Sequence, residues 1–71
     1  MMYVVEIKRN GNRKTMYKVV RQLTDAMQYV GVWYMNKNKV NEIDSITIHH
    51  GTKDELIDKL PNMSVAHLYN V

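Results

Sequence analysis

The longest run of patterned hydrophobic positions extends from Leu23 to Asn36 and predicts the central helix of the fold. At helical spacing one stripe of this run is apolar, and it consists of Ala26, Tyr29, Val30 and Trp33. Thr24 is placed to cap the helix N-terminus through its hydroxyl, with Asp25 near the positive end of the helix dipole. Burying the single Trp removes about 150 to 250 Å² from water, so we expect the rest of the chain to pack around this helix.

Two strands joined by a tight turn are predicted before the helix. Residues 2–8 are rich in strand formers and lead into Asn10-Gly11-Asn12, a strong hairpin signal. A two-residue loop at Asn10-Gly11 would mix apolar and charged side chains on each face, whereas a three-residue loop leaves one face largely apolar. The prediction is therefore a hairpin that pairs Ile7 with Thr15, Val5 with Tyr17, and Tyr3 with Val19.

An alternative interpretation places the helix earlier, over residues 15–30. Apolar residues also recur there at helical spacing, Gly31 would be the C-terminal cap, and residues 32–35 would form a strand. That helix would leave the Asn-Gly turn without a following strand. Thr24 and Asp25 are also more typical of a helix start than of a helix interior. We therefore favour the hairpin.

A third strand is predicted from Ile43 to His50, where apolar and polar positions alternate. One face would carry Ile46, Ile48 and His50, and the other would carry Ser45, Thr47 and His49.

A short helix follows, opened by a capping box over residues 52–55 and stopped by Pro61. Its predicted buried side consists of Leu56, Ile57 and Leu60. The tail, residues 63–71, fits either an edge strand through Val65, His67 and Tyr69 or a segment on the surface, and both alternatives stay open.

These elements predict one α+β domain over residues 1–71, in ββαβα order, with an antiparallel hairpin and a third strand packed on the central helix. The chain has no Cys, so neither a disulfide nor a thiolate metal site is expected. No apolar run approaches the ~20 residues of a membrane span, and the N-terminus lacks the pattern of a signal peptide. We expect a soluble, cytoplasmic protein that does not bind a membrane.

The net charge of +3 is unevenly distributed along the chain. Residues 1–40 carry eight Lys or Arg and two acids, whereas residues 41–71 carry two Lys and five acids. The hairpin holds five of the basic residues: Lys8, Arg9, Arg13, Lys14 and Lys18. Such a surface suits a solvated face, a protein partner, or nucleic-acid phosphates in a groove that admits a two-stranded ribbon.

The predicted helix is apolar around more of its circumference than one sheet can cover. Val32, Tyr34 and Met35 lie away from the buried stripe. Tyr, Trp and Met are favoured in interface cores. We therefore expect Tyr34 and Met35 to contact a partner protein or a second copy of the chain in a homodimer.

Candidates for catalysis or metal binding are weak. His49 and His50 are adjacent on a strand, so their side chains leave opposite faces and cannot share one ion without distortion. Glu42 and Asp44 would share a strand face, a spacing that suits a cation or an acid–base pair. No nucleophile elbow, P-loop or dinucleotide motif is present. The expectation is therefore a protein that is not an enzyme, with no metal and no cofactor.

The segments YVVEIKRNGNRK, LTDAMQYV and SITIHHGT, in a composition rich in Asn, Lys, Met and Ile, carry a general resemblance to the small accessory proteins of phages and mobile elements from low-GC bacteria. The resemblance implies stoichiometric binding to a host protein, for instance inhibition of a host enzyme or defence system. It assigns a role to no individual residue.

The combined hypothesis is a non-catalytic protein-binding module, with a small nucleic-acid-binding protein as the alternative. Its predicted binding residues are Lys8, Arg9, Arg13, Lys14, Lys18, Tyr34 and Met35.

Overall fold

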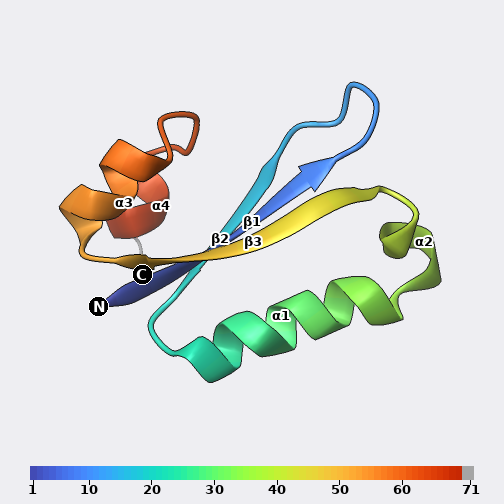
Figure 1. The fold of residues 1–71 in the computed structure, drawn as a ribbon, viewed down its shortest axis with the longest axis horizontal. Helices are drawn as coiled ribbons and strands as arrows, with labels where there is room; N and C mark the ends of the chain where they lie inside the picture. The colour runs from blue at the N-terminus through green and yellow to red at the C-terminus, as the bar shows by residue number, and fades with distance from the viewer. Residues whose placement is uncertain (70–71) are drawn as a thin grey trace.

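A computed structural model describes residues 1–69 of the chain (Figure 1). Its elements are β1 (Met2–Arg9), β2 (Met16–Val20), α1 (Leu23–Met35), α2 (Lys37–Val40), β3 (Ile43–Gly51), α3 (Lys53–Lys59) and α4 (Ala66–Tyr69). The strands form one antiparallel sheet in the order β2-β1-β3. The predicted α+β class and ββαβα order are confirmed, and α2 and α4 are short additional helices.

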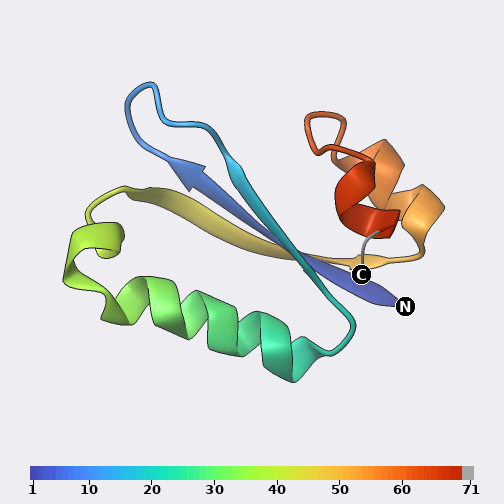
Figure 2. The same ribbon diagram turned by 180° about the vertical axis from the view of Figure 1, so that it is seen from behind.

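The sheet carries helices on both faces. Helix α1 covers one face, while α3 and α4 cover the other face near the N-terminal end of β1 (Figures 1 and 2). Two apolar clusters result. The cluster under α1 contains Val5, Ile7, Ala26 and Trp33. The cluster under α3 and α4 contains Met2, Val4, Val19, Leu56, Leu60, Met63 and Leu68.

The predicted hairpin is present, but its predicted register is wrong by one residue. The observed register places Tyr3 opposite Val20, Val4 opposite Val19, and Ile7 opposite Met16. Residues 10–15 connect the strands, with Gly11 at a φ of +69°. The prediction assumed a single apolar face, but the first half of β1 is buried on both faces, so apolar alternation did not distinguish one register from the next.

Helix α1 confirms the predicted apolar stripe. Ala26 and Trp33 are buried against the sheet, and Tyr29 and Val30 pack beside them. Gly31 lies inside the helix and residues 16–20 form a strand, so the alternative helix over residues 15–30 is wrong.

The predicted N-cap of this helix is also wrong. Helix α1 begins at Leu23, its N-cap residue is Gln22, and no side chain caps it. The carbonyl of Gln22 accepts hydrogen bonds from the N–H groups of Asp25 and Ala26. Because the link from β2 is so short, the helix begins before Thr24, which lies in the first turn.

Residues 43–60 follow the prediction. Strand β3 alternates as expected, and Thr52 and Glu55 form the predicted capping box of α3. The tail forms neither of the alternatives left open, because residues 66–69 make a helical turn that buries Leu68 completely. Residues 70 and 71 lie outside the described part of the chain.

Candidate functional site

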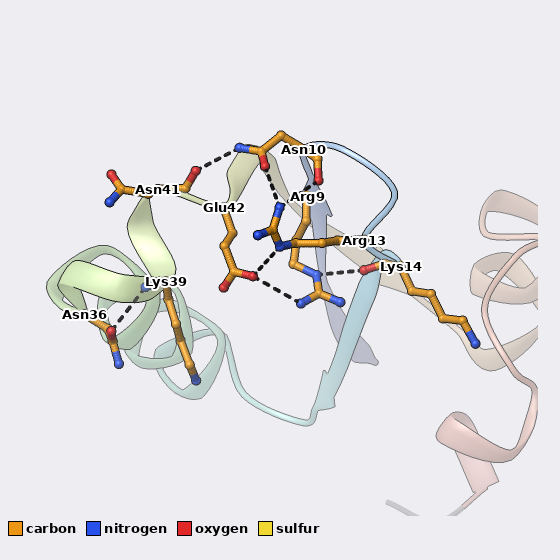
Figure 3. Close-up of polar contacts among 8 residues, drawn as sticks. All are labelled: Arg9, Asn10, Arg13, Lys14, Asn36, Lys39, Asn41 and Glu42. Carbon is orange, nitrogen blue, oxygen red and sulfur yellow. Dashed lines mark hydrogen bonds and ion pairs between the residues drawn. The ribbon is translucent and has the colours of Figure 1, made fainter.

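The tip of the β1–β2 hairpin is tied to the segment that leads into β3 (Figure 3). Arg13 Nε lies 2.7 Å from Glu42 Oε1, and Arg9 Nη1 lies 3.8 Å from the same oxygen. Arg9 Nε also donates to the carbonyl of Lys14 at 2.8 Å. The two guanidinium groups therefore hold the tip in place through one carboxylate.

Asparagine side chains extend the same network. The backbone N–H of Asn10 donates to the carbonyl of Glu42 at 2.9 Å, and its amide donates to the carbonyl of Asn41 at 2.8 Å. Asn36 caps α2 by accepting from the N–H groups of Asn38 and Lys39. Helix α2, the hairpin tip and the start of β3 thus form one end of the molecule with fixed relative positions.

The five basic residues predicted as a binding face are divided by the structure. Lys8 is exposed on the sheet face opposite α1, whereas Lys18 lies on the α1 side with its Nζ 5.8 Å from the ring centroid of Tyr29. The exposed side chain of Lys14 extends away from the network (Figure 3). Lysines thus project on different sides of the hairpin, while the two arginines contact Glu42.

Tyr34 and Met35 are exposed at the C-terminal end of α1, as the sequence predicted, with exposed fractions of 55% and 85%. They precede α2, which adds Lys37 and Lys39 to this end of the molecule. Lys39 also places its Nζ 5.0 Å from the ring centroid of Trp33. Exposed apolar side chains and lysines thus lie next to each other along the chain.

A polar cluster that the sequence did not reveal crosses all three strands on the face opposite α1. His49 Nε2 lies 3.0 Å from Glu6 Oε1, and Tyr17 lies directly across from Glu6 in the register. Burial raises the pKa of Tyr17, and the charge of Glu6 and a hydrogen bond to it raise that pKa further. The wrong register hid this cluster because it placed Tyr17 beside Val5.

The remaining candidates stay apart. His50 lies against Tyr3 on the opposite face from His49, and Glu42 precedes β3 and contacts arginines rather than Asp44. Residues 1–69 contain no group of three His, Asp or Glu side chains that could hold a metal ion. In the same part of the chain, no helix is both long and apolar enough to cross a bilayer.

Comparison of the chain with protein-family models, with curated proteins and with solved structures finds no match.

Proposed function

We propose that the protein is a non-catalytic binding module for another protein, and that it acts by covering an acidic surface of that partner. The contact surface is the basic end, which we define as the hairpin tip, helix α2 and the C-terminus of α1. The observation that carries this proposal is the shared carboxylate of Glu42. It orders two arginines, yet cancels only one of the charges contributed by Lys8, Arg9, Arg13, Lys14, Lys37 and Lys39.

The fixed geometry supports binding in two ways. A positive surface steers an acidic partner and raises the association rate. A tip already held by Arg9, Arg13 and Glu42 loses little conformational freedom when it binds, so less interaction energy is spent on ordering. Tyr34 and Met35 supply the apolar contacts that charged surfaces lack.

The resemblance to phage accessory proteins suggests the biological form of this activity, namely stoichiometric inhibition of a host protein. In this form Lys8, Lys14 and Met35 would make direct contacts, while Arg9 and Arg13 would keep the surface in shape.

The experiment is capture from a nuclease-treated lysate of the source cell with three baits: the wild type, Lys8→Glu/Lys14→Glu, and the matched control Lys53→Glu/Lys59→Glu. Both variants change the charge by the same amount at opposite ends of the molecule. We expect the wild type and the control to capture the same acidic protein and the basic-end variant to lose it. Equal capture by all three baits would remove the basic end from the proposal.

Nucleic-acid binding is the second candidate, favoured by the exposed lysines of the hairpin. The engagement of both guanidinium groups by Glu42 weakens it, because phosphates would have to compete with a carboxylate already in place. Affinity for duplex DNA that falls with salt, by a slope of about −0.9 per neutralised phosphate, would establish this candidate.

A further inference from the structure

The two edges of the sheet differ in length and protection. Strand β2 has five residues, contains Lys18, and contacts α4. Strand β3 has nine residues, pairs only with β1 among the described strands, contains no Lys, Arg or Pro, and contacts α3. Length and composition, rather than helix contacts, therefore distinguish the two edges. Long edge strands without such residues are templates for pairing with another strand. The β3 edge is therefore the part of the sheet best suited to accept one.

The backbone groups available on this edge follow from the alternation of the strand. Lys59 Nζ lies 3.3 Å from the carbonyl oxygen of His50, so that carbonyl faces away from β1. Successive residues of a strand direct their N–H and C=O groups to opposite sides. Ile46 and Ile48 therefore present their backbone groups on the same open side as His50.

We propose that a second copy of this chain occupies the β3 edge, pairing antiparallel about a two-fold axis at Thr47. This register sets Ser45 against His49 of the second copy, Ile46 against Ile48, and Thr47 against Thr47. It also brings Asp44, which lies at the shift in the β1–β3 pairing, near His50 of the second copy. It joins outward-facing Ile46 to outward-facing Ile48, as an antiparallel ladder requires. Asp44, near one end of each β3 strand, then faces the end of the other copy's strand where His50 and Lys59 lie.

One flank of α1 supplies a second layer to this interface. Tyr29 lies against Lys18 of β2, so that side of the helix faces the β2 edge. At about 100° per residue the other flank, toward β3, carries Leu23, Met27 and Tyr34. These side chains are 45%, 60% and 55% exposed. Three of the five exposed large apolar side chains of α1 thus lie on the flank toward β3, and the other two, Val32 and Met35, lie elsewhere on the helix.

The strand edge alone buries too little surface for a stable dimer, so the interface needs the α1 flank as well. A stable interface buries about 800 Å² per partner, whereas a nine-residue strand edge is only about 30 Å long and one strand wide. The α1 flank supplies the remainder. The basic end adjoins the first residues of β3, so a two-fold axis at Thr47 separates the two basic ends and leaves Lys8, Lys14 and Met35 uncovered. The dimer therefore adds a second copy of the proposed binding surface and shares only Tyr34 with it.

Mass in solution tests this proposal across a concentration series of the full chain. We expect twice the 8.4 kDa of one chain for the wild type. Thr47→Lys brings two ammonium groups together at the axis and should weaken the dimer more than about tenfold, whereas the control Met16→Lys, on the β2 edge, should not. Single-chain mass at every concentration, or a dimer unaffected by Thr47→Lys, would overturn the proposal.

The register has its own tests. Asp44→Lys should weaken the dimer and adding His50→Glu should restore it, because those positions meet only between copies.

A cysteine cross-link is the second test of the register. The chain contains no Cys, and directly opposed residues that do not hydrogen-bond lie about 4.5 Å apart at Cα. Thr47→Cys should therefore form a disulfide-linked dimer, and Met16→Cys should not. Failure of both the charge rescue and the cross-link contradicts the register. Lys8→Glu/Lys14→Glu should leave the mass unchanged, which separates this proposal from the proposed function.

Discussion

Glu42 forms an ion pair with Arg13, whose Nε lies 2.7 Å from Glu42 Oε1, and a longer one with Arg9. A single carboxylate therefore joins the hairpin tip to the start of β3. Glu42 is far from both arginines in the sequence, and the side chains of the three residues are between a fifth and a half exposed. Pairs with that much exposure are individually weak. Their effect is to fix the geometry of the tip rather than to dominate stability.

Replacing this carboxylate tests its role. Glu42→Gln should lower the free energy of unfolding by about 1 kcal/mol, because two partly exposed pairs are lost. Amide hydrogen exchange should accelerate over residues 10–15. The matched change Asp58→Asn removes an exposed acid of α3 and should alter neither quantity. Unchanged exchange at the hairpin tip in Glu42→Gln would show that the network does not hold it.

Helix capping offers a comparison between two threonines. Thr52→Ala should cost about 1 kcal/mol, because the Thr52 hydroxyl accepts from the N–H of Glu55 and caps α3. Thr24→Ala should cost much less, since the N-cap of α1 is Gln22. Urea denaturation of both variants measures the difference. Equal losses would mean that Thr24 has a capping role that the structure does not show.

Trp33 should be the most sensitive core position. Its side chain is 3% exposed, and its indole N–H has no hydrogen-bond partner within the described structure. Trp33→Ala should cost about 3 to 5 kcal/mol, a large part of the roughly 4 to 10 kcal/mol that a chain of this length holds. Trp33→Phe should cost less than half as much, because an aromatic ring remains and the unpaired donor is removed. Similar losses in thermal unfolding for Phe and Ala would contradict this explanation.

The Tyr17 hydroxyl should make stability depend on alkaline pH. Burial and the Glu6 carboxylate raise its pKa above the unfolded value of 10.0, so the folded state retains the proton more tightly. Its contribution is complete below the unfolded pKa and is lost as the pH rises through the folded pKa. The difference in urea midpoint between wild type and Tyr17→Phe should therefore shift against the wild type above pH ~10. Parallel pH profiles would exclude this linkage, and Glu6→Gln should reduce it.

The sequence predicted those elements whose signals are local. The capping box at Thr52 and Glu55, the alternation of β3 and the apolar stripe ending at Trp33 all depend on spacing within a few residues, and the structure confirms them. The single-turn helix at residues 66–69 was missed because Leu68 is buried by tertiary packing on α3 and β2 rather than by a periodic pattern of its own.

Long-range pairing was the main source of error. The first half of β1 is apolar on both faces, so a one-residue shift of β2 leaves an apolar surface in either register. That shift separates Lys8 from Lys18 and joins Glu6 to Tyr17. The contacts of Glu42 with two arginines could not be anticipated either, because the order of the strands brings these distant residues together. The continuous apolar run MYVV at residues 2–5 was the signal that could have predicted a central strand with helices on both faces.

The most direct test of the binding proposal is hydrogen exchange of the protein alone and in complex with the purified partner that the wild type captures. We predict slower exchange at residues 8–14 and 35–39, with residues 53–69 unchanged. Protection confined to α3 and α4, or the absence of any protein that binds in a manner dependent on Lys8 and Lys14, would contradict it.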